Sequence, residues 1–90
     1  MAAELIHQFR DPVPSADGVL YVAQAWAARD HGWNGWLVFI AADGRILRTA
    51  CETTQPSRDA LRRWVVQLVA ADLRAALQRA VPPNAELPAA

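Results

Sequence analysis

The residues best suited to chemistry lie where the strand-like half of the chain gives way to a helix. Residues 53–57 read TTQPS, and arginines follow in the first turns of that helix. Hydroxyls, guanidinium groups and the free N–H groups of a helix N-terminus all bind phosphate or carboxylate oxygens. Arginines at this end also oppose the helix dipole, a cost that a bound anion would offset. One hypothesis is therefore an anion-binding site made of Thr53, Thr54, Ser57, Arg58, Arg62 and Arg63.

The same charges have a simpler interpretation. Asp59 and Glu52 are close enough in sequence to neutralise these arginines, and a charged helix start is commonly a solvated face. No glycine-rich phosphate loop precedes the helix. Both interpretations stay open at this point.

A second hypothesis concerns aromatic residues in a turn-rich segment. Trp33 and Trp36 lie near Arg29 and His31, a combination that would stack on single-stranded bases if the rings were exposed. A tryptophan beside a glycine-bounded turn serves equally well as a core plug or an interface anchor. The nine basic and nine acidic residues give a formal net charge of zero, so no overall field attracts nucleic acid.

Catalysis has little support in the sequence. His7, His31 and Cys51 fall on separate segments, lack metal-ligand spacing and have no glycine-rich elbow beside them. We therefore expect no enzyme activity, no metal ion and no cofactor. Cys51, the single cysteine, is expected to be a small core residue.

The elements that must position these residues begin with strands. Apolar and aromatic content predicts strands over 5–10, 19–29 and 36–40, and two prolines with an Asp-Gly pair predict a loop over 11–18. Asp-Gly at 43–44 then predicts a two-residue hairpin turn, after which residues 45–53 return as a fourth strand.

That turn sets an expected register for the hairpin. It pairs Ile40 with Leu47, Val38 with Thr49 and Trp36 with Cys51 on one face. The other face is apolar as well, whereas a half-solvated sheet should alternate apolar and polar residues. One helix covers one face only, so the other face needs a partner chain, a ligand or the flanking segments of the chain to cover it, and self-association is the first choice.

One long helix is predicted from the N-cap Ser57 to about Ala80, before the two prolines at 82 and 83. Trp64 lies in the middle of its apolar arc. Asp72 interrupts the arc, so it either bonds a buried donor or marks a break where a second helical segment starts. Residues 82–90 are predicted to be a disordered tail.

Length and composition complete the picture. Ninety residues allow one domain, expected over 1–81. No apolar run reaches the roughly 18 residues of a membrane helix, and no signal-peptide pattern begins the chain, so a cytoplasmic location is expected. The bias toward arginine and alanine resembles that of GC-rich bacterial genomes.

Two resemblances follow from these patterns. Residues 33–39 (WNGWLVF), residues 53–57 (TTQPS) and Trp64 resemble a family of small, uncharacterised bacterial proteins, a likeness that implies no activity. Four antiparallel strands followed by a helix are similar in order to the PC4-like fold, which implies a dimer that binds single-stranded nucleic acid.

Taken together, the sequence predicts an α+β fold, in which a four-stranded antiparallel meander precedes one long C-terminal helix packed on one face of the sheet. The expected function is that of a small non-catalytic interaction or regulatory module that forms a homodimer. Single-stranded nucleic-acid binding is the alternative, and small-anion binding at the helix N-terminus is a second alternative.

Overall fold

An antiparallel sheet with two helices makes up residues 2–83, the part of the chain that the computed structural model describes. The expected α+β class with an antiparallel sheet is confirmed, but six strands and two helices replace the four strands and one helix expected. The strands are β1 Glu4–Gln8, β2 Val13–Pro14, β3 Leu20–Arg29, β4 Trp33–Ala41, β5 Ile46–Arg48 and β6 Thr53–Gln55, and the helices are α1 Arg58–Val66 and α2 Ala70–Arg79. The predicted tail falls mostly on residues 84–90, outside the described residues.

The long strands β3 and β4 form the centre of the sheet. They pair from Tyr21 opposite Ala41 to Arg29 opposite Trp33, and burial alternates along both strands. The sheet order is β1-β3-β4-β5, while β2 pairs with β3 and β6 pairs with β4. Every pairing between the strands is antiparallel.

The hairpin between β4 and β5 differs from its predicted register by one residue. Ala41 donates its N–H to the Arg45 carbonyl at 2.9 Å, which closes a three-residue loop instead of a two-residue turn. The reason is conformational: Gly44 has a positive φ of 90° but Asp43 does not, whereas a type I′ turn needs positive φ at both positions. A one-residue slip exchanges the two faces of a strand.

As a result, Ile40 pairs with Ile46 and Val38 with Arg48, whereas Leu47 pairs with Phe39 on the buried face.

The returning strand is also interrupted, which the sequence did not predict. Thr49 turns inward and is 1% exposed, where its hydroxyl accepts a hydrogen bond from the Leu37 N–H at 3.0 Å. The chain rejoins the ladder as β6, where Thr53 pairs with Gly35. Cys51 lies within the interruption and so does not pair with Trp36.

The expected single helix breaks between α1 and α2. Val69 is extended, with φ −110° and ψ 172°, and precedes α2 as its N-cap residue. The exposed Asp72 carboxylate accepts a hydrogen bond from the Val69 N–H at 3.0 Å. Of the two predicted roles of Asp72, the start of a second helical segment is therefore the one observed.

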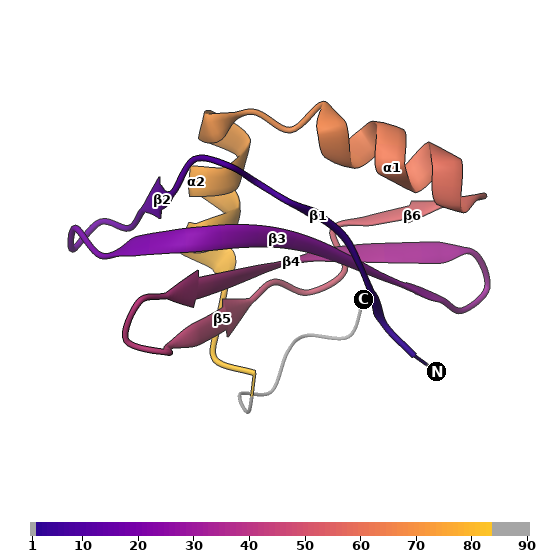
Figure 1. Ribbon diagram of the computed structural model, residues 1–90. Coiled ribbons are helices and arrows are strands. Elements are labelled where there is room, and N and C mark those ends of the chain that lie inside the picture. The colour runs from indigo at the N-terminus through magenta and orange to yellow at the C-terminus, as the bar shows by residue number, and fades with distance from the viewer. Residues whose placement is uncertain (1, 84–90) are drawn as a thin grey trace.

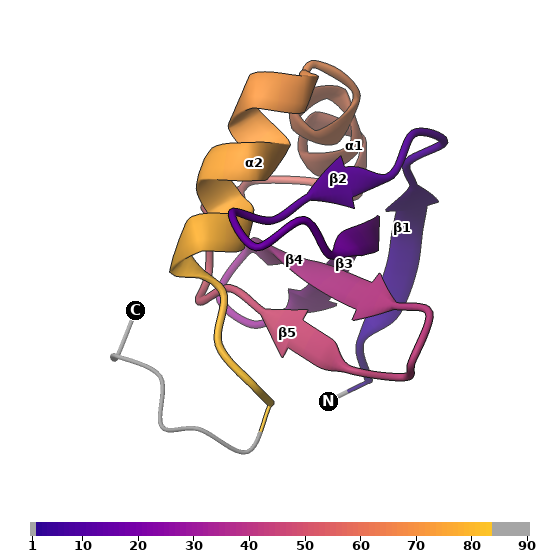
Figure 2. The ribbon, with the colours of Figure 1, turned by 90° about the vertical axis from the view of Figure 1, so that its left-hand side faces the viewer.

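Both helices lie over the same face of the sheet (Figure 1). Helix α1 contacts β1, β4 and β6, and α2 contacts β2 (Figure 2). Apart from Tyr21, the residues of β3 on this face are the alanines Ala23, Ala25 and Ala27, so larger residues from β4 and the helices supply much of the core volume. The core residues are Val13, Tyr21, Ala23, Ala25, Ala27, Leu37, Phe39, Ala41, Leu61, Val65, Leu73, Ala76 and Leu77.

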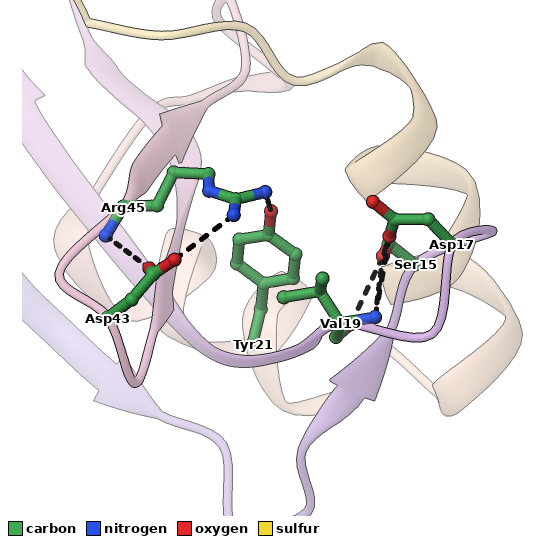
Figure 3. Close-up of polar contacts among 6 residues, drawn as sticks. All are labelled: Ser15, Asp17, Val19, Tyr21, Asp43 and Arg45. Carbon is green, nitrogen blue, oxygen red and sulfur yellow. Dashed lines mark hydrogen bonds and ion pairs between the residues drawn. The ribbon is translucent and has the colours of Figure 1, made fainter.

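In each of two turns, an aspartate carboxylate accepts hydrogen bonds from neighbouring residues of the turn (Figure 3). Asp43 accepts a hydrogen bond from the Arg45 backbone N–H at 2.9 Å, which lowers the pKa of its carboxyl, and the Arg45 guanidinium lies 3.0 Å away. In the other turn, the Ser15 hydroxyl donates to Asp17, and this bond lowers the pKa of Asp17.

Candidate interaction face

The face of the sheet opposite the helices is rich in apolar side chains. On the two central strands, Trp26 pairs with Trp36 and Val22 with Ile40, and all four side chains point away from α1 and α2. Strands on either side continue the same face. We call this surface the open face and define it by Leu5, Gln8, Leu20, Val22, Gln24, Trp26, Trp36, Val38, Ile40, Ile46 and Arg48.

Large apolar residues on the open face are accessible to solvent. Leu20 is 56% exposed, Leu5 45%, Ile46 42% and Val22 39%. They come from three strands and so form a surface that spans the sheet. The largest exposed apolar patch of a protein often marks a binding site.

The polar groups of the open face bond to one another. Trp26 donates its Nε1–H to Gln24 Oε1 at 2.9 Å, and Gln24 Nε2 donates to Gln8 Oε1 at the same distance. The Arg48 guanidinium carbon lies 5.3 Å from the Trp36 ring centroid, within range of a cation–π interaction. The defined face carries no carboxylate and a single cation, which is held against an aromatic ring.

The structure separates the two tryptophans proposed as a stacking platform. Trp36 belongs to the open face, whereas Trp33 packs against the core on the helix side. His31 adopts a positive φ of 55° in an exposed turn. The residue opposite Trp36 on the neighbouring strand is Trp26, which the predicted site omitted because residues paired across two strands are distant in sequence.

At the predicted anion site, the central arginine already has a partner. Arg58 Nε donates to Glu4 Oε1 at 2.9 Å and its NH2 group lies 3.3 Å from Oε2, so the two groups form a forked ion pair. The hydrogen bond to Glu4 raises the pKa of Arg58. Ser57 acts as the predicted N-cap, since its hydroxyl accepts the Ala60 N–H at 3.1 Å.

The remaining members of that site are not brought together. Thr53 pairs with Gly35 and Thr54 with Asn34, so the two hydroxyls lie on opposite faces of the sheet. Thr54 donates to Asn34 Oδ1 at 2.8 Å, and Thr53 accepts from Gln55 Nε2 at 2.7 Å. Arg62 and Arg63 are exposed on α1.

The titratable residues considered for catalysis also lie apart. His7 packs edge-on against Phe9, with ring centroids 4.7 Å apart, whereas Cys51 Sγ lies 3.2 Å from the Thr53 carbonyl oxygen. Within residues 2–83, no three His, Cys, Asp or Glu side chains gather in a way that would hold a metal ion. Neither α1 nor α2 is long and apolar enough to cross a membrane.

Comparisons with protein-family models, with curated proteins and with solved structures found no match to this chain. The interpretation of the open face therefore depends on its own geometry.

Proposed function

We propose that this protein is a non-catalytic interaction module that forms a homodimer through the open face. The observation that carries the proposal is the cluster of exposed apolar residues Leu5, Leu20, Val22 and Ile46 on the side of the sheet away from both helices. Packing two such faces together would remove this surface from water, at roughly 25 cal/mol per Å² of apolar area.

The charge pattern supports a second copy as the occupant. A surface that selects an unlike partner commonly presents charges that complement those of the partner. The open face offers only Arg48, already placed over Trp36, and the whole chain has a formal net charge of zero. Two copies related by a two-fold axis would therefore meet without strong repulsion.

The size of the face suits a modest interface. The strands β1, β3, β4 and β5 have five, ten, nine and three residues. At about 4.8 Å between strands and about 3.3 Å per residue, they present on the order of 400 Å² per copy. Two copies would bury about 800 Å² in total, at the small end of the range, where interfaces are weak and transient. We therefore expect a dimer that dissociates on dilution.

The test is sedimentation velocity on a dilution series, from about 500 µM to about 1 µM. Wild type should change from dimer to monomer across the series, and Val22→Glu, which places a charge on the open face, should stay monomeric and folded. Val66→Glu is the matched control, because Val66 is 58% exposed on α1 and lies outside the open face. A wild type that is monomeric throughout, or a dimer that only Val66→Glu disrupts, would rule out the proposal.

Single-stranded nucleic-acid binding is a second candidate, favoured by the Trp26–Trp36 pair with Arg48 on a face without carboxylates. Aromatic rings on an open sheet stack on bases. A mixed single-stranded oligonucleotide should then quench tryptophan fluorescence at low salt. Loss of this quenching in Trp26→Ala, combined with a monomeric wild type, would support this candidate over the dimer.

A further inference from the structure

A cavity lies on the helix side of the molecule, and none of its lining residues belongs to the open face. Its volume is about 180 Å³, and its walls come from the β1–β2 connection, the α1–α2 connection and α2. Phe9 and Val13 form one side, and Leu68 and Leu73 form the other. Val13 and Leu73 belong to the buried core, so the cavity has an apolar floor.

Charged groups stand around this apolar floor. Arg10 and Arg74 line the cavity from opposite walls and are exposed, and neither forms an ion pair with a residue among 2–83. Asp11 also lines the cavity, so the three charged residues sum to one positive charge. An apolar pocket whose guanidinium groups have no ion-pair partner among residues 2–83 favours a ligand that combines an apolar body with a carboxylate.

We propose that this cavity binds a small carboxylic acid with one ring or a short aliphatic chain. An apolar protein cavity of about 150 Å³ holds one benzene ring, so the volume here suits a ligand of that size. The apolar part would contact Phe9, Val13 and Leu73, and the carboxylate would accept hydrogen bonds from Arg74 or Arg10. This site is independent of the proposed dimer, because it shares no residue with the open face.

The test is a two-dimensional ¹H–¹⁵N NMR titration of the full chain with three probes. Benzoate carries both ring and charge, benzyl alcohol carries the ring alone, and acetate carries the charge alone. Benzoate should shift the amide signals of Phe9, Val13, Ala70 and Leu73 in a saturable way, and the other two probes should bind at least about fivefold more weakly. Benzoate binding should also weaken with added salt.

Two variants separate charge from shape. Arg74→Gln should weaken benzoate binding by about fivefold and leave benzyl alcohol unaffected, while Arg63→Gln, on the exposed side of α1, should leave both unchanged. Ala70→Leu, which adds volume at the cavity wall, should block both probes.

Repeating the titration with Val22→Glu checks that binding does not need the open face. No saturable shifts with benzoate, or equal binding of benzoate and benzyl alcohol, would overturn the proposal.

Discussion

At the scale of single residues, the contact between Gly35 and Leu61 determines how closely α1 approaches the sheet. Leu61 is fully buried, and a Cβ atom on Gly35 would lie 3.1 Å from Leu61 Cδ1 and 3.2 Å from Thr53 Cγ2. Distances this short require a neighbour to move. Glycine is therefore needed here for space and not for a positive φ, since Gly35 does not have one.

This contact leads to the first prediction. Gly35→Ala should lower the free energy of unfolding by about 1–3 kcal/mol, because the new methyl group overpacks a core with no room for it. In a Leu61→Ala background the same substitution should cost much less, because the opposing side chain is gone. Urea denaturation of the two single variants and the double variant measures the coupling. Equal costs of Gly35→Ala in both backgrounds would mean that the Leu61 contact does not limit the space.

From the apolar period of α1, Trp64 is expected to be the most buried residue of the helix, and it is not. It lies in the middle of the apolar arc in sequence but is only partly buried, whereas Leu61 and Val65 are 0% and 1% exposed. Helix α1 is oriented so that the residues facing Gly35 and the small side chains of β3 lie in the core. We therefore attribute more of the stability of α1 to Leu61 than to Trp64.

At the scale of elements, the break between the helices depends on a short-range cap. Val69 cannot cap a helix with its own side chain, and the Asp72 carboxylate accepts the Val69 N–H instead. A carboxylate in the first turn also interacts favourably with the helix dipole. The local sequence thus specifies where α2 begins.

The second prediction tests this cap. Asp72→Ala should lower the free energy of unfolding by about 1 kcal/mol, because the Val69 N–H loses its acceptor and the helix start loses a negative charge. Asp72→Asn keeps an acceptor and should cost less. Urea denaturation followed by circular dichroism measures both. Gln78→Ala, an exposed change in the same helix, is the control, and an equal loss in all three variants would contradict the capping role.

The two turns shown in Figure 3 lead to the third prediction, which concerns acid. Hydrogen bonds lower the pKa of Asp17 and of Asp43 below the ordinary value of 3.8. A carboxyl whose pKa is lower in the folded than in the unfolded state stabilises the fold above pH 3.8, and this stabilisation is lost as the pH falls through the folded-state pKa. We therefore expect the melting temperature to fall below about pH 4.

Asp43→Asn should reduce the melting temperature slightly at neutral pH and make its decline in acid shallower, because the titrating carboxyl is gone. Thermal melts followed by circular dichroism at a series of pH values measure this. Asp59→Asn is the comparison, because Asp59 lies on α1, away from these turns. An acid decline of unchanged steepness in Asp43→Asn would show that other carboxyls cause it.

At the scale of the whole molecule, the two faces of the sheet differ in what covers them. One is covered by α1 and α2 and holds every residue of the buried core, and the other exposes apolar side chains from three strands. The ion pair from Arg58 to Glu4 ties the first strand to the first helix, and the bridge between Arg48 and Val81 ties the end of the second helix to β5. Contacts distant in sequence thus hold the helices on one side.

The fourth prediction belongs to this scale. If two copies meet through the open face, the melting temperature of wild type should rise with protein concentration, because association stabilises the folded state by mass action. The melting temperature of Val22→Glu should not depend on concentration, and that of Val66→Glu should follow wild type. Calorimetry over the same dilution series measures this. A wild-type melting temperature that is independent of concentration would contradict a folded dimer.

The sequence alone determined the local features of this protein. Strand-forming residues located β3 and residues 36–40 of β4, Ser57 marked the start of α1, and Asp72 marked one possible start of a second helical segment. The apolar residues on both faces of the predicted hairpin indicated that one helical layer would leave an apolar face uncovered. Each of these features depends on interactions between residues near one another in the chain, so composition and periodicity report them directly.

Only the tertiary structure decided the register of the β4–β5 hairpin, the inward turn of Thr49 and the pairing of Trp26 with Trp36. It also decided that the arginines and hydroxyls of the predicted anion site find different partners, Glu4 and Asn34 among them. These outcomes depend on a turn conformation and on strands that meet across long sequence separations. A change of one residue in register exchanges the faces of a strand, so small local differences decide which side chains reach the surface.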